Sequence, residues 1–80
     1  MNKAGELMTR TMWGLAIHDG DSSEDSLVSE NHFVHFADVH AAMKKHKGKA
    51  FVVRIPKTAK PMEIQAIHNL RNLGYLVEAQ

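Results

Sequence analysis

The chain has no cysteine and only two prolines among its 80 residues. Without cysteine it forms no disulfide and has no thiol for catalysis, so packing or self-association must hold the fold. This absence also favours a reducing compartment. No apolar run approaches the roughly 20 residues that cross a bilayer, and residues 1–10 contain no apolar run of signal-peptide length. We therefore expect a cytoplasmic protein that does not use a membrane.

Aromatic residues are also few, at 6%, whereas 44% of the residues are hydrophobic and 24% are charged. This composition is typical of a globular chain rather than a disordered one. A chain of this length has room for one domain, which buries roughly 60% of the surface that its unfolded form exposes. We expect a flexible tail over residues 1–10 and a single α/β domain over residues 11–80.

Strand patterns occur at four places, residues 11–18, 32–36, 50–55 and 75–79. In the first, Trp13, Leu15 and Ile17 alternate on one face. The third is the most continuous apolar run of the chain and ends at Pro56, which favours a central strand buried on both faces. Residues 19–30 are acidic and serine-rich, so we expect a solvated loop there.

Helical spacing occurs in two segments, residues 38–47 and 58–73. In the first, Asp38 is the expected N-cap and Met43 belongs to the apolar face. Each segment is followed by a glycine, Gly48 or Gly74, which suits a left-handed helix end. In the second segment an apolar stripe predicts the buried side: Met62, Ala66, Leu70 and Leu73, widened by Ile67.

The resulting order is β-β-α-β-α-β, which predicts a small α/β (α+β) domain with two helices packed on a roughly four-stranded sheet. Right-handed crossovers put both helices on one face if they step in the same direction, and on opposite faces if they reverse. The pattern leaves this choice open. A ferredoxin-like arrangement is the main alternative, but it needs a helix between the first two strands. Only the short polar segment 22–30 is available for one.

Charge is strongly segregated along the chain, although the net charge is only +1. Residues 19–38 carry acids and no Lys or Arg, namely Asp19, Asp21, Glu24, Asp25, Glu30 and Asp38. Residues 44–60 carry bases and no acid, namely Lys44, Lys45, Lys47, Lys49, Arg54, Lys57 and Lys60. These lysines predict one positive edge that meets phosphates or an acidic protein. The alternative is a set of solvated loops whose opposite charges attract one another.

Two metal hypotheses arise from the acidic residues and the six histidines. Five oxygen-bearing residues fall at EF-hand-like places: Asp19, Asp21, Ser23, Asp25 and Glu30. The sixth place lacks the required glycine, and a strand rather than a helix precedes the loop. The candidate zinc ligands are His32, His35, His40 and His46. On a strand, His32 and His35 point to opposite faces, and the spacing of His40 and His46 does not place them on one face of a helix. We expect an ordinary acidic loop and no zinc site, while calcium binding by residues 19–30 stays open.

Catalytic patterns are not found in the sequence. No glycine-framed elbow surrounds a serine, and there is no glycine-rich phosphate loop. The neighbours His18 and Asp19 diverge on a strand and form no dyad. A chain this short also has little room for a small-ligand pocket. We expect no enzymatic activity, no cofactor and no small-molecule substrate.

By elimination, the sequence predicts a non-enzymatic regulatory module that binds another protein or a second copy of itself. Small inhibitors and adaptors of phages and mobile elements often have this size and lack cysteine. Trp13 is a candidate apolar anchor, although it also fits the core. The alternative is a nucleic-acid-binding module, whose lysines would contact phosphates. The candidate contact residues are Lys44, Lys45, Lys47, Lys49, Lys57 and Lys60.

Overall fold

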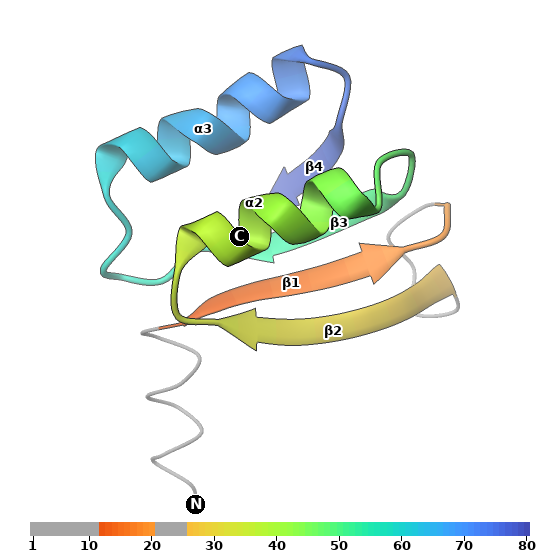
Figure 1. The fold of residues 1–80 in the computed structure, drawn as a ribbon, viewed down its shortest axis with the longest axis horizontal. Coiled ribbons are helices and arrows are strands. Elements are labelled where there is room, and N and C mark those ends of the chain that lie inside the picture. Colours follow the sequence, from red (N-terminus) through yellow and green to blue (C-terminus); the bar gives the residue numbers. More distant parts are fainter. Residues whose placement is uncertain (1–11, 21–25) are drawn as a thin grey trace, which may run out of the picture.

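The structure, a computed structural model, describes residues 12–20 and 26–80. Its elements are β1 (Trp13–His18), β2 (Leu27–Phe33), α2 (Phe36–Lys45), β3 (Ala50–Arg54), α3 (Pro61–Asn72) and β4 (Leu76–Ala79) (Figure 1). The predicted order and class are confirmed, because two helices pack on one four-stranded mixed sheet. The tail expected over residues 1–10 lies outside the described residues.

The sheet has the strand order β2-β1-β3-β4, so the first strand is inserted between the second and the third. β1 is antiparallel to both of its neighbours, and β3 is parallel to β4. The direct antiparallel pairing of β1 with β2 differs from the ferredoxin-like arrangement, in which a helix crosses between the first two strands. That alternative is not adopted. β2 and β4 form the two edges of the sheet.

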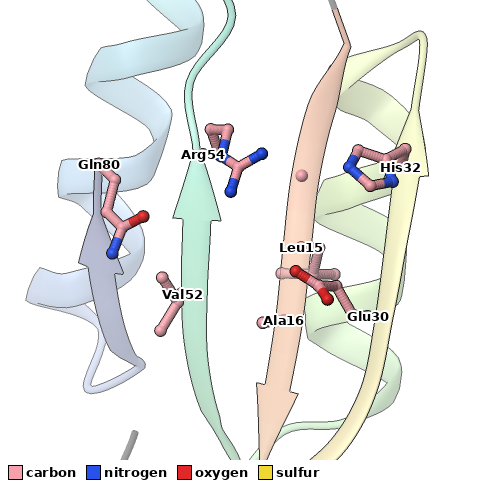
Figure 2. Close-up of a pocket in the computed structure, with 8 residues that line it drawn as sticks. Leu15, Ala16, Glu30, His32, Val52, Arg54 and Gln80 are labelled. Atoms are coloured by element: carbon pink, nitrogen blue, oxygen red, sulfur yellow. The ribbon is translucent and has the colours of Figure 1, made fainter. Parts of the chain in front are cut away.

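Both helices cover the same face of the sheet, which settles the choice that the sequence left open. The connection through α2 runs from β2 to β3, and the connection through α3 runs from β3 to β4. Both therefore step in the same direction, and crossovers of one hand then lie on one side. Figure 2 looks onto the sheet and shows both helices behind it. Neither helix of this described part is long and apolar enough to cross a membrane.

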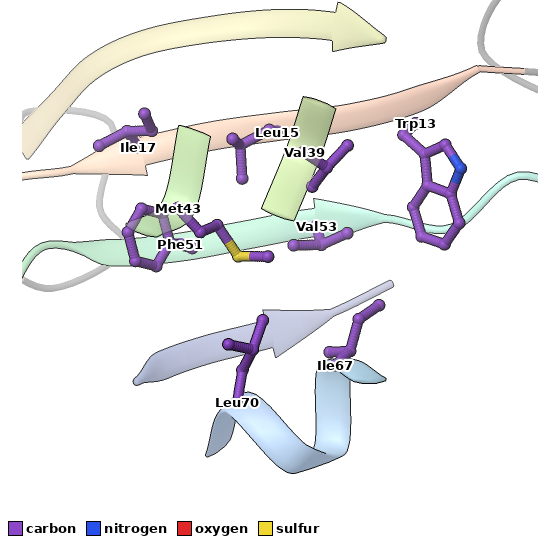
Figure 3. Packing of buried hydrophobic residues seen from close by; sticks show 9 residues of the cluster. All are labelled: Trp13, Leu15, Ile17, Val39, Met43, Phe51, Val53, Ile67 and Leu70. Atoms are coloured by element: carbon purple, nitrogen blue, oxygen red, sulfur yellow. The ribbon is translucent and has the colours of Figure 1, made fainter. Parts of the chain in front are cut away.

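The hydrophobic core lies between this face and the helices (Figure 3). Trp13, Leu15 and Ile17 are at most 3% exposed, so their predicted alternation is confirmed. Leu15 pairs with Val53, and Ile17 pairs with Phe51, so the two central strands present one apolar layer. The other core residues come from the helices and β3: Val39, Met43, Phe51, Val53, Ile67 and Leu70.

β3 is a central strand, as predicted, but it is not buried on both faces. Phe51 and Val53 are at most 1% exposed beneath the helices. On the other face Val52 is only half-buried and Arg54 is exposed. The expectation of burial on both faces is wrong because both helices lie on one side of the sheet.

β2 is the element whose position the sequence pattern predicts wrongly. The strand expected over residues 32–36 runs instead over Leu27–Phe33, so it begins inside the loop expected over residues 19–30. Phe36 begins α2, and the N-cap is His35 rather than Asp38, which lies in the first helical turn. Because β2 lies at an edge with most side chains exposed, it needs no apolar face and has little hydrophobic signal.

α3 packs through its middle turns rather than along the whole predicted stripe. Ile67 and Leu70 are at most 3% exposed, whereas Met62 and Leu73 are 75% and 72% exposed. Leu73 is already the C-cap, and Met62 stands in the first turn, so both lie at the ends of the helix. Gly74 follows with a φ of 98°, which confirms the predicted left-handed end.

Candidate functional site: an open sheet face and an open edge

One face of the sheet has no helix on it in the described part of the chain, and the strand register identifies its residues. Residues paired across neighbouring strands point to the same side. Gly14 of β1, for example, pairs with His32 of β2 and with Arg54 of β3. We call the part of this surface on β1, β2 and β3 the open face and define it by Gly14, Ala16, Glu30, His32, Val52 and Arg54.

A shallow hollow of ≈ 40 Å³ lies on the open face (Figure 2). Its lining includes Gly14 and Ala16 of β1, with Glu30 and His32 of β2 on one side and Arg54 of β3 on the other. A Cβ atom at Gly14 would stand 3.2 Å from the Arg54 Cβ and 3.9 Å from the His32 Cδ2, so glycine permits this close approach. Small-ligand sites usually measure about 300–1,000 Å³. The hollow is therefore far too small for such a ligand.

The outer edge of β2 is the second part of the candidate site. We call it the open edge and define it by residues 27–34. β2 has seven residues, and in the described part of the chain it pairs with β1 on one side only. The exposed fractions of Leu27, Val28 and Val34 are 43%, 54% and 64%. Edge strands are commonly protected by lysine, proline, short length or a β-bulge. β2 has no lysine or proline, and its register with β1 shifts only beside Val28, near its start.

A larger hollow of ≈ 360 Å³ lies where α2 and α3 begin. There the backbone N–H of Lys60, the N-cap of α3, donates to the Glu63 carboxylate at 2.8 Å. A carboxylate of the chain itself therefore occupies this hydrogen-bond donor. Trp13 also lines this hollow, but it is only 2% exposed and packs on Phe36 with ring centroids 4.9 Å apart. The structure places the candidate anchor Trp13 in the core.

The basic residues do not lie on one continuous edge. Lys44, Lys45 and Lys47 lie at the end of α2 and in the connection to β3, whereas Lys57 and Lys60 follow the other end of β3. The strand between them is five residues long, which corresponds to about 17 Å. β3 therefore divides the predicted positive edge into two separate groups.

Lys49 is engaged within the molecule. Its Nζ donates to the Asp19 Oδ1 at 2.8 Å, where β1 ends and β3 begins. This hydrogen bond and the charge of Lys49 hold the pKa of Asp19 below its ordinary value of 3.8, against a smaller opposing effect of desolvation. The ion pair joins the acidic segment to the basic segment, as the solvated-loop interpretation expects. Nearby, the Lys47 Nζ lies 5.7 Å from the centroid of the Tyr75 ring.

Among the described residues, those of the two metal hypotheses do not form a metal site. Asp19 holds Lys49, and Glu30 lies in β2 on the open face. The other EF-hand-like positions, Asp21, Ser23 and Asp25, lie outside the described residues. Within residues 12–20 and 26–80, no three His, Cys, Asp or Glu side chains are grouped as a metal site requires.

The open edge is the part of this surface that the sequence pattern does not reveal. In the sequence Glu30 stands out as an acid and a candidate calcium ligand and His32 as a candidate zinc ligand, whereas in the structure both point to the same side of β2. The signal that could have revealed it is a period-two alternation over residues 27–33. Both faces of β2 carry polar residues, so its sequence lacks the alternation of apolar and polar residues that marks a half-buried strand.

Comparison with known proteins does not place the chain in a family. No family model, no curated protein and no solved structure matches it. The function must therefore be inferred from the geometry and chemistry of the chain itself. Its open edge and open face are the surfaces that geometry distinguishes.

Proposed function

We propose that the chain is a non-enzymatic protein-binding module that accepts an extended segment of a partner protein along the open edge. The observation that carries this proposal is the exposed seven-residue edge strand β2. An edge strand directs a row of backbone N–H and C=O groups away from its sheet. An extended partner segment satisfies these groups by adding a further strand, and the main-chain hydrogen bonds supply affinity.

Side chains of the open face add selectivity to this backbone pairing. A strand added beside β2 directs every second side chain to the open face, next to Glu30 and His32. These two residues present a carboxylate that accepts hydrogen bonds and an imidazole that both donates and accepts them. The exposed Val28 and Val34 lie near the two ends of the edge. We expect a preferred segment with polar residues in its middle and apolar residues toward its ends.

Nucleic-acid binding is supported less well by the same geometry. A phosphate backbone favours lysines gathered along one groove, whereas β3 separates Lys44, Lys45 and Lys47 from Lys57 and Lys60. The net charge of +1 also gives little long-range attraction for a polyanion. Binding of nucleic acid is the competing outcome of the test below.

A displayed library of random peptides tests the proposal. The full chain is immobilised sparsely, so that copies do not meet, and the sites of the selected peptides are mapped by amide chemical shifts. We expect the peptides to perturb the amides of residues 27–34. They should lose affinity in Asn31→Lys, because a lysine in an edge strand opposes strand addition. Asn72→Lys makes the same change at an exposed position of α3 and should leave binding unchanged.

Two results would contradict the proposal. The first is a selection that yields no binders, or binders whose shifts lie away from the open edge. The second is a labelled oligonucleotide that binds at low salt and shifts the amides of Lys44, Lys45 and Lys47, with an affinity that falls steeply as salt is added. That result would support the nucleic-acid alternative instead.

A further inference from the structure

Residues 29–33 of β2 read Ser-Glu-Asn-His-Phe and place Glu30 and His32 symmetrically about Asn31. When two copies of this strand run antiparallel with Asn31 at the centre, Glu30 of each copy lies opposite His32 of the other. In the same register Ser29 of each copy lies opposite Phe33 of the other, on the side of the sheet that the helices cover. Two-fold symmetry repeats each pair, which is the property of an isologous interface.

Neighbouring registers lack this complementarity. With Glu30 at the centre, the Glu30 carboxylates of the two copies lie directly opposite each other. With His32 at the centre, Glu30 lies opposite the apolar Val34. Like charges placed directly across two strands destabilise the pairing, whereas a carboxylate opposite an imidazole accepts a hydrogen bond from it. The charge pattern therefore selects the register centred on Asn31.

The backbone of the sheet allows this pairing. A two-fold axis perpendicular to the sheet keeps the open faces of both copies on one side and their helices on the other. Glu30 and His32 both point to the open face, so they meet there. In the described part of the chain no strand lies beside the outer edge of β2. β2 ends at Phe33, and Val34 lies in the bend that leads to α2 and lines the hollow where the helices begin, so Leu27–Phe33 supplies the pairing.

We infer that the occupant of the open edge is a second copy of this chain, paired through β2 in an antiparallel register centred on Asn31. Reciprocal contacts between Glu30 and His32 fix that register, because a carboxylate accepts a hydrogen bond from either a neutral or a protonated imidazole. The pairing joins two four-stranded sheets into one continuous sheet. This inference rests on the proposed function, since it uses the same edge and names the partner.

Complementation between two charge variants tests the register. In Glu30→Lys the new lysine faces His32 of the second copy and no carboxylate remains there. In His32→Glu the new carboxylate faces Glu30. We expect each variant alone to dimerise at least about ten-fold more weakly than the wild type, as measured by sedimentation between about 10 μM and about 1 mM. An equimolar mixture should form a heterodimer, because lysine then faces glutamate and His32 faces Glu30.

Glu78→Lys provides the matched control. It makes the same charge change on the same side of the sheet, but on β4, at the edge opposite β2 and outside the open face. We expect it to dimerise as the wild type does. The fluorescence of Trp13, which is 2% exposed, reports whether each variant is folded. The inference is overturned if the folded wild type stays monomeric throughout, if the single variants dimerise normally, if their mixture does not associate, or if Glu78→Lys abolishes the dimer.

The peptide selection separates failure of this inference from failure of the proposed function. If the wild type is monomeric but its open edge still binds selected peptides, only the inference that a second copy occupies this edge is overturned. A monomeric wild type that binds no peptide along residues 27–34 overturns both. A dimer that shows complementation supports both, because the second copy is then itself the extended segment at the edge.

Discussion

Val52 and Val53 are consecutive valines of β3 that point to opposite faces of the sheet, so they provide a matched test of its one-sided packing. Replacing either by alanine removes the same two methyl groups and the same strand preference. Val53 is 0% exposed beneath the helices, whereas Val52 is half-buried on the open face. The difference between the two variants in free energy of unfolding therefore reports how well each face is covered.

The expected loss is larger for Val53→Ala. Removing two fully buried methyl groups costs about 1.6 kcal/mol, at roughly 0.8 kcal/mol for each carbon. The void that remains adds up to about 1 kcal/mol, so the total is about 2–3 kcal/mol. For Val52→Ala we expect less than about 1 kcal/mol, because water already reaches this side chain. In a domain of this size, each kcal/mol lowers Tm by about 4–8 °C.

Urea unfolding followed by tryptophan fluorescence measures both variants, since Trp13 is the single tryptophan of the chain and is buried. The midpoint should move while the slope with urea stays constant, which shows that stability changed rather than the unfolded state. Equal losses for Val52→Ala and Val53→Ala, or a larger loss at Val52, would refute the conclusion that the helices cover only one face.

Three further predictions concern single contacts. Because Lys49 lowers the pKa of Asp19, their ion pair stabilises the folded chain above pH 3.8. This contribution is lost as the pH falls through the lowered pKa. Carboxyl NMR should show the pKa of Asp19 rising in Lys49→Gln. Gly48→Ala should cost about 1–2 kcal/mol in thermal unfolding, because Gly48 has a φ of 99° with open space around it. Ile67→Ala should cost about 2–5 kcal/mol, whereas Met62→Ala, at a 75% exposed position, should change stability by less than about 0.5 kcal/mol. An unchanged pKa, an unchanged Tm, or equal costs at the two α3 positions would contradict the respective prediction.

The elements that could be predicted are those whose burial leaves a pattern in the sequence. β1 is recognisable because Trp13, Leu15 and Ile17 all face the core. The end of α3 is recognisable because Gly74, directly after the C-cap, adopts a positive φ, whereas α2 already ends at Lys45 and Gly48 lies in the turn beyond its C-cap His46. β2 could not be placed, because an exposed edge strand satisfies its backbone without burying one face, so its residues resemble those of a loop. The aromatic and β-branched residues 32–36 predict a strand, but Phe33 ends β2 and Phe36 begins α2.

The candidate site was less accessible to sequence reasoning than the fold. The lysines of residues 44–60 form one group along the chain. In the structure, strand β3 runs between Lys47 and Lys57, so the lysines before β3 and those after it lie at its opposite ends. Conversely, Glu30 and His32 are close in sequence, yet their shared direction becomes visible only once residues 27–33 are known to be a strand. A surface of this kind depends on strand register, which composition and charge runs do not encode.

The insertion of β1 between β2 and β3 has a consequence for how the chain reaches its native state. During synthesis β1 emerges long before the segment Ala50–Arg54 with which it pairs. A two-stranded hairpin of β1 and β2 is only marginally stable in water, so the apolar side chains of β1 stay uncovered until β3 is complete. We therefore expect folding to wait for this distant pairing, during which the apolar side of β1 is exposed to aggregation.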